Sequence, residues 1–235
     1  MKSSQKELAS RGYLPEDSSI QKLSKEEAVN QLDAADPVKR SAAARLIGHS
    51  FILEAGAAKA LLERLLIEKK LYSRMEICSA LGKGNAQTVE QMIPYIGKLG
   101  KNQHQTIADA KSSKKKNYPL ARDIIARTLA NMGEFTVAVL FELLKEPEAI
   151  REGLDALGYQ IFYSSRLQTL ENFEKGKAYY ERYSADLLLV WKFVTFCSAF
   201  PPAYTHDVLA EIEVSFSEKV IQEELVRTRK LSKIH

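Results

Sequence analysis

The sequence is poor in cysteine and tryptophan, with two cysteines and one tryptophan in 235 residues. Two cysteines are too few for a disulfide framework. Cys78 and Cys197 both lie within apolar helical patterns, where a thiol behaves as a small hydrophobic side chain. This usage is typical of a reducing compartment. We therefore expect a cytoplasmic protein.

The sequence also lacks an apolar run of membrane-spanning length. The most apolar stretch, DLLLVWKFVTFCSAF at 186–200, is short and carries Lys192 at its middle, whereas a spanning helix needs about 20 apolar residues. Residues 1–19 contain no apolar core of the kind found in secretory signals. We expect no membrane contact and interpret 186–200 as a buried helix of a folded protein.

No familiar catalytic motif is present. We find no Cys-x-x-Cys, Gly-x-Gly-x-x-Gly, phosphate-binding loop or Gly-x-Ser-x-Gly. The four histidines are scattered and none is followed by glutamate. The sequence therefore predicts no cofactor, no metal site and no catalytic residue.

Strand-like alternation is nearly absent, and helical patterns take its place. The stretch DPVKRSAAARLIG at 36–48 shows the pattern most clearly. Asp36 can accept hydrogen bonds from the first turn of a helix, and Pro37 suits the first helical position. Arg40 lies on one side, small apolar residues lie on the other, and Gly48 could end the helix in the left-handed conformation.

This pattern recurs three times, each time ending in glycine. The copies are KLYSRMEICSALG at 70–82, ARDIIARTLANMG at 121–133 and EPEAIREGLDALG at 146–158. They carry Arg74, Pro147 and the glycines Gly82, Gly133 and Gly158. An amphipathic segment precedes each copy, the first after a capping box that starts at Ser24. We expect helix pairs with breaks near 36, 71, 117, 147 and 185, and positive φ at several of the glycines.

These copies resemble the short HEAT repeat, also known as the HEAT-like or PBS-lyase-type repeat, over residues 24–165. The resemblance implies an all-α, right-handed α-α superhelix, a solenoid of helix pairs whose second helices line the concave side. Arg40 and Arg74 resemble the motif arginine, which bonds acids or carbonyls of the adjacent repeat. We expect an N-terminal extension at 1–23, a basic insertion at about 100–117, and further helical repeats with a cap at 166–235.

Positive charge is concentrated in the first half of the chain. Residues 1–127 contain 22 bases and 14 acids, and residues 128–235 contain 12 and 16. Six lysines and one acid lie between 98 and 116. A loop this long is either solvated and mobile or an electrostatic contact for phosphates or an acidic protein surface. The candidate binding residues are Lys111, Lys114, Lys115, Lys116, Arg122, Arg127 and Arg45.

The resemblance favours a non-enzymatic scaffold or adaptor that binds an acidic protein partner through this basic face. One alternative is a nucleic-acid-binding or DNA-repair solenoid of the glycosylase type. It would need a carboxylate and an aromatic ring together, for which Asp123 with Tyr118 is the candidate pair, because we expect Trp191 in the core. A second alternative is a lyase or maturation factor similar to the phycobilin lyases.

Overall fold

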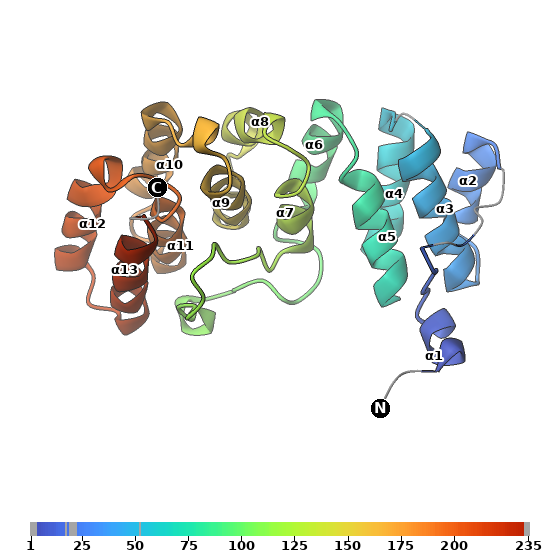
Figure 1. The fold of residues 1–235 in the computed structure, drawn as a ribbon, viewed down its shortest axis with the longest axis horizontal. Helices are drawn as coiled ribbons and strands as arrows, with labels where there is room; N and C mark the ends of the chain where they lie inside the picture. Colours follow the sequence, from blue (N-terminus) through green and yellow to red (C-terminus); the bar gives the residue numbers. More distant parts are fainter. Residues whose placement is uncertain (1–3, 17, 19–22, 52, 233–235) are drawn as a thin grey trace. The chain divides into compact units, whose positions relative to one another are not determined.

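The computed structural model describes residues 4–16, 18, 23–51 and 53–232. These residues form thirteen α-helices and three short 3-10 helices, and contain no strand (Figure 1). The predicted all-α class is therefore confirmed. The chain divides into two compact units, Met1–Met92 and Ile93–His235. The division falls inside the predicted repeat region, at a point that the sequence analysis did not mark.

Unit 1 is built from two stacked helix pairs with a further helix at each end. Helix α2 pairs with α3 and α4 with α5, while α3 packs on α5 and α2 on α4. Helix α6 packs on α4, and α1 packs on α3, so the predicted N-terminal extension contains a docked helix. The helices are α1 (Gln5–Ser10), α2 (Lys25–Gln31), α3 (Pro37–Ser50), α4 (Ala55–Ile67), α5 (Leu71–Leu81) and α6 (Ala86–Met92).

The helix starts follow the local sequence signals. Ser24 and Glu27 form the expected capping box ahead of α2. The Asp36 carboxylate accepts a hydrogen bond from the Val38 N–H at 2.9 Å, and Pro37 is the first residue of α3. These contacts satisfy N–H groups that have no partner inside the helix.

The glycines that end the repeated pattern correct one prediction. Gly48 lies inside α3, and a Cβ there would lie 2.7 Å from the Ala80 Cα of α5. Gly82 directly follows α5 but has a right-handed φ of −61°, and Gly158 lies inside α9 (Pro147–Phe162). Of the four, only Gly133 has positive φ, at 118°. At Gly48 the pattern marks close helix packing rather than a left-handed cap.

Unit 2 contains the remaining helices. Helices α7, α9, α11 and α13 pack on one another in that order, and α8, α10 and α12 pack on α9, α11 and α13. Paired helices are thus present in the C-terminal third, and the continuation of one repeat array through this region stays a prediction. The helices are α7 (Ile124–Leu129), α8 (Phe135–Leu143), α9, α10 (Leu170–Arg182), α11 (Leu187–Cys197), α12 (Pro202–Ser215) and α13 (Lys219–Leu231), with 3-10 helices η1 (Ile93–Tyr95), η2 (Ile107–Asp109) and η3 (Ser165–Leu167).

The apolar run at 186–200 forms the central helix of this unit. Every residue of α11 after Leu187 is buried, including Trp191 and Lys192. The predicted buried helix is confirmed, and Trp191 lies in the core as expected. Among the residues described, no helix combines the length and hydrophobicity needed to cross a bilayer.

The basic insertion is longer than predicted and is anchored to the helices of unit 2. Helix α7 starts at Ile124, not near 117, and the segment before it contains only the single turn η2. Tyr118 is buried, with its hydroxyl oxygen 3.5 Å from the Leu154 carbonyl of α9. Ser112 donates a hydrogen bond to Glu224 of α13. The segment therefore covers the α9–α11–α13 layer and contributes to its core.

Candidate functional site

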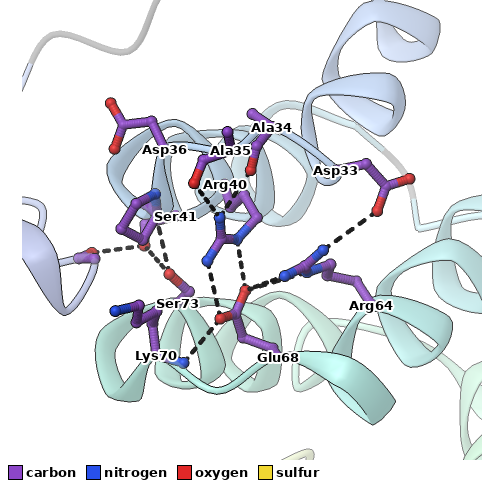
Figure 2. A network of polar contacts seen from close by, with 12 residues as sticks. Asp33, Ala34, Ala35, Asp36, Arg40, Ser41, Arg64, Glu68, Lys70 and Ser73 are labelled. Carbon is purple, nitrogen blue, oxygen red and sulfur yellow. Dashed lines mark hydrogen bonds and ion pairs between the residues drawn. The ribbon is translucent and has the colours of Figure 1, made fainter.

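The arginines of the repeated pattern fall into two groups, and Arg40 represents the first. Its Nε and Nη2 donate to the two carboxylate oxygens of Glu68 at 2.7 and 3.0 Å, and its Nη1 donates to two carbonyls that precede α3. Glu68 also pairs with Arg64 (Figure 2). Burial alone would raise the pKa of Glu68, but the hydrogen bonds from Arg40 and Lys70 lower it to about 2. Arg40 thus has the structural role that the motif implies.

Arg45 belongs to the same group. Its guanidinium donates to both carboxylate oxygens of Glu76, at 3.1 and 2.5 Å, and to the carbonyls of Leu14 and Pro15, at 2.9 and 2.6 Å. These contacts within unit 1 occupy the whole guanidinium, so the prediction that Arg45 stands free on a basic binding face is corrected. Arg74 is half-buried, and its Nε has no hydrogen-bond partner among the described residues. Arg74 therefore does not repeat the contacts that Arg40 makes as the motif arginine.

Arg122 and Arg127 form the second group, on either side of the first turn of α7. Asp123 caps this turn by accepting from the Ala126 N–H at 2.8 Å, and this fixes the positions of the flanking arginines. Both arginines are exposed. Arg127 donates through Nε to the Ala121 carbonyl at 2.8 Å, and neither guanidinium pairs with a carboxylate of the described residues. Two positive charges are therefore left without neutralising partners.

These two arginines line a pocket of about 480 Å³ together with Lys101. We name it the basic pocket; its other lining residues are Asn102, Gln103, Gln105 and Asp109. Asp109 is held by the N–H groups of Gln105 and Thr106, at 3.0 and 2.9 Å. Three cations against one carboxylate give the basic pocket a surplus of positive charge, which favours an anionic ligand.

The floor of the basic pocket is formed by Gln103, which is only 7% exposed. Its Nε2 donates to the Leu99 carbonyl at 2.6 Å and to Asp123 at 2.8 Å, which fixes the orientation of the amide. Its Oε1 has no partner among the described residues. This oxygen is itself buried, so Gln103 joins the pocket to the Asp123 cap of α7 and does not present an acceptor to a ligand.

The four selected lysines of the insertion do not line this pocket. Lys111, Lys114, Lys115 and Lys116 are exposed, and none makes an ion pair with a described residue. The expectation that they gather with Arg122 and Arg127 in one contact is corrected, since Lys101 fills that role. They remain available as a separate, solvated row of charge on the same segment.

Asp123 and Tyr118, the pair that would signal a glycosylase-like site, are both internal. Asp123 is fully buried and is used by Ala126, Gln103 and Gly97. Tyr118 is 1% exposed and packs against Gly158, where a Cβ would lie 1.9 Å from its hydroxyl oxygen. Neither side chain lines the basic pocket. Their contacts are those of a helix cap and a core aromatic residue.

A buried ionic cluster links α9 to α11. The Lys192 ammonium is 2.8 Å from the Glu152 Oε1 and 2.8 Å from the Asp155 Oδ2, and the Lys192 side chain is fully buried. The His104 ring stands edge-on to Trp191, with centroids 5.1 Å apart. Burial, reinforced by the Lys192 charge, lowers the pKa of His104 to about 4. The imidazole is therefore neutral at neutral pH.

The cluster holds two carboxylates against one ammonium, and this imbalance predicts a pH effect on stability. Burial raises the pKa of Glu152 to about 7, with Lys192 opposing and Asp155 adding to the shift. Between pH 4.5 and 7 the folded state therefore keeps a proton that the unfolded chain releases, so this contribution to stability is lost as pH rises through 7. We expect Glu152→Gln to become more stable relative to the parent as pH rises from about 5 to about 8.

Urea unfolding followed by Trp191 fluorescence checks this pH effect. Glu171→Gln on α10 is the matched control, because Glu171 is exposed and the pKa of its carboxyl is lowered by Lys175. Its difference from the parent should not vary over the same pH interval. A pH-independent difference for Glu152→Gln would contradict the interpretation.

A second pocket, of about 580 Å³, adjoins the basic pocket at Gln105. Its walls come from η2, the start of α9, the end of α10 and the start of α11. Ile107, Pro147 and Leu187 give it apolar surface, and Arg151 is neutralised there by Asp186. A ligand anchored in the basic pocket could extend toward this less polar surface.

Metal-binding potential and similarity to known proteins assign no activity. The described residues contain no group of three or more His, Cys, Asp or Glu placed to hold a metal ion.

No family model and no curated protein matches the chain. Two similar solved structures are crystal structures of engineered proteins from the Northeast Structural Genomics Consortium. One has a TM-score of 0.41 and 18% identity, covering 89% of this chain and 96% of its own. The other has a TM-score of 0.39 and 15% identity, covering 91% and 100%.

Sequence reasoning missed Lys101 and Gln103 as members of the site. Lys101 is one of the six lysines between 98 and 116, and no local pattern distinguishes it from the denser lysine run at 114–116. The sequence signal that could have identified the site is Asp123, which marks the start of α7. A residue that forms a hydrogen bond with this N-cap lies beside Arg122 and Arg127. Gln103 makes that bond from 20 positions away, a distance along the chain that no local pattern encodes.

Proposed function

We propose that this chain is a HEAT-like helical-repeat binding protein of the cytoplasm that holds an acidic segment of a protein partner in the basic pocket. The observation that carries the proposal is the contrast between the arginines. Arg40 and Arg45 are neutralised by buried or half-buried carboxylates, whereas Arg122 and Arg127 share a pocket with Lys101 and have no such partner. Buried or clustered cations without counter-charges favour an anionic ligand.

The lining of the basic pocket favours an acidic peptide over a nucleic acid. None of its lining residues is aromatic, and stacking on aromatic rings is the usual way in which single-stranded bases are held. The carboxylates of an acidic peptide pair with the three cations without such a ring.

The exposed lysines of the insertion have a different role in this proposal. Lys111, Lys114, Lys115 and Lys116 lie outside the pocket and make no specific pairs, so they act on the approach of an acidic partner rather than on the bound contact. Charges of this kind raise the association rate and increase the dependence of binding on salt.

A peptide titration tests the proposal. We expect a fluorescein-labelled oligoglutamate peptide to bind the chain, with an anisotropy signal that weakens as salt is raised. Arg122→Ala with Arg127→Ala should reduce affinity by about 100-fold or more, because two charge-assisted contacts, each worth roughly 1.5–3 kcal/mol, are lost. Lys114→Glu, Lys115→Glu and Lys116→Glu together should slow association while leaving the melting temperature nearly unchanged.

The matched control removes two positive charges elsewhere in unit 2. Lys219 and Lys230 are exposed on α13 and do not line the basic pocket, so Lys219→Ala with Lys230→Ala should leave affinity within about twofold, as expected for solvated charges. Equal losses of peptide affinity in both double variants would show that the peptide is attracted by positive charge in general and is not bound in the basic pocket. If a labelled single-stranded oligonucleotide binds more tightly than the peptide, and this binding is lost in the Arg122 and Arg127 variant, the ligand of the pocket is a nucleic acid and not a protein.

A further inference from the structure

In unit 1, the chain that leaves α1 lies across α3 and α5. Arg11 and Gly12 form the turn that ends α1, and residues 13–15 follow it without regular structure. We name residues 11–15, Arg-Gly-Tyr-Leu-Pro, the docked segment. Its carbonyls are held by groups of the two helices: Ser41 Oγ donates to Gly12 at 2.6 Å, and the Tyr72 N–H donates to Arg11 at 3.1 Å. Arg45 donates to the carbonyls of Leu14 and Pro15. Four of its five carbonyls are therefore captured.

The side chains of the docked segment add one aromatic contact and one steric requirement. The Tyr13 ring stands edge-on to Tyr72, with centroids 5.0 Å apart, and the Arg11 guanidinium lies 5.4 Å from the centre of the same ring. Gly12 has φ of +83°, and a Cβ there would lie 2.2 Å from the Ser73 hydroxyl. The surface therefore selects glycine followed by an aromatic residue.

The helices that receive the segment are organised by contacts of their own. The Ser73 hydroxyl donates to the Pro37 carbonyl at 3.0 Å, and the Ser41 hydroxyl oxygen lies 3.0 Å from both the Ser73 hydroxyl oxygen and the Pro37 carbonyl oxygen (Figure 2). Because Ser41 has a single hydroxyl proton, its donation to Gly12 can be replaced by donation to Pro37 when the docked segment leaves. Arg45 is fixed by both oxygens of Glu76. These contacts do not involve the docked segment, so the receiving groups keep their positions when it leaves.

The docked segment buries little side-chain surface, so burial contributes little to holding it in place. Only Gly12 is buried in it, Tyr13 is 39% exposed, and the six-residue helix α1 that precedes it has no buried residue. Apolar burial is the main source of stability in folding, and elements that lack it open at low free energy. A rigid receptor surface with a weakly held occupant is the arrangement expected of an exchangeable ligand.

The geometry points to the α3–α5 face of unit 1 as a peptide-binding surface for a partner segment in which a glycine turn is followed by an aromatic residue. The docked segment occupies this surface in cis and competes with the partner. This inference does not depend on the basic pocket, which lies in unit 2. Recognition through backbone carbonyls is compatible with several partner sequences, provided that the glycine is present.

The full-length Gly12→Val variant tests the inference, because valine cannot adopt the left-handed φ or fit beside Ser73. The probe is a labelled peptide of residues 8–16, LASRGYLPE. We expect it to bind Gly12→Val at least tenfold more tightly than the parent, in which the docked segment covers the binding surface. A peptide with valine in place of its glycine should not bind either chain.

Two second-site variants in the Gly12→Val chain locate the binding surface. Arg45→Lys keeps the charge beside Glu76 but loses the fork that holds two carbonyls, so peptide affinity should fall about tenfold. Arg64→Lys is the matched control in the same unit, since Arg64 pairs with Asp33 and Glu68 and does not touch the docked segment. It should leave peptide affinity unchanged.

Each remaining outcome overturns the inference. If the peptide fails to bind a folded Gly12→Val chain, or binds it equally well after Arg45→Lys, the α3–α5 face is not a peptide-binding surface. A fall in melting temperature of more than about 5 °C in Gly12→Val would show that the segment is an integral part of the fold. If the parent is a dimer in light scattering and Gly12→Val is a monomer, the occupant is a second copy of this chain and not a partner peptide.

Discussion

Lys192→Met should lower the free energy of unfolding of unit 2 by about 3–5 kcal/mol, the usual cost of removing one partner from a buried ion pair. Methionine fills nearly the same volume, so the loss comes from charge and not from a cavity. Without the ammonium, Glu152 and Asp155 remain in the interior with side chains that are 4% and 10% exposed. Both carboxylates would then lack their shared counter-charge.

Urea unfolding at neutral pH, followed by Trp191 fluorescence, measures this loss. Because Trp191 is the only tryptophan and neighbours Lys192 in α11, the signal reports on this unit. Lys175→Met is the control, since its pair with Glu171 is exposed, and it should cost about 0–1 kcal/mol. If Lys192→Met does not fold, adding Glu152→Gln and Asp155→Asn should restore folding. A loss below about 1 kcal/mol would show that the buried charges are not coupled.

Gly48→Val should lower the stability of unit 1 by about 1–3 kcal/mol or more, the cost of overpacking a close contact. The cause is contact with α5 and not backbone conformation. A Cβ at residue 48 would lie 2.7 Å from the Ala80 Cα and 2.9 Å from the Ala80 Cβ. Backbone atoms cannot move aside as the end of a flexible side chain can, so α3 and α5 must separate.

Two alanine variants distinguish this packing from helix propensity. Alanine inside a helix normally gains about 0.5–1 kcal/mol over glycine. Gly56→Ala in α4 meets nothing within 4 Å and should be neutral or stabilising, whereas Gly48→Ala should be destabilising. Thermal unfolding by circular dichroism compares them. Gly48→Ala as stable as Gly56→Ala would mean that the helices pack less closely than the structure shows.

The repeated pattern predicted helix starts well because those signals are local. Asp36 and Pro37 act within one turn, and Ser24 with Glu27 within three residues, so the sequence alone identifies them. Gly48 and Gly158 were interpreted wrongly as helix ends, because a left-handed cap and a close helix contact both require the smallest residue, whereas Gly133 follows α7 with positive φ as predicted. Gly48 faces Ala80 from another pair, and only the packing of α3 on α5 shows which requirement applies.

The candidate site was predictable only in part, for the same reason. The sequence identifies the arginines as positive charges, but their ion-pair partners lie about 30 residues away along the chain. Glu68 is the partner of Arg40, and Glu76 is the partner of Arg45. Whether an arginine is neutralised depends on this pairing between helices. The i, i+3 spacing of Glu152 and Asp155 places them on one face of α9, yet nothing local identifies Lys192 as their partner.

The most direct test of the central claim is a side-chain NMR titration of arginine. The chain is labelled with ¹⁵N-arginine and the unlabelled oligoglutamate peptide is added, with signals assigned by single Arg→Lys variants. We predict that the Nε–H signals of Arg122 and Arg127 shift together with the peptide, while that of Arg40, bound to Glu68, does not move. If Arg122 and Arg127 stay unchanged while the peptide binds, or if exposed arginines elsewhere shift equally, the basic pocket is not the binding site.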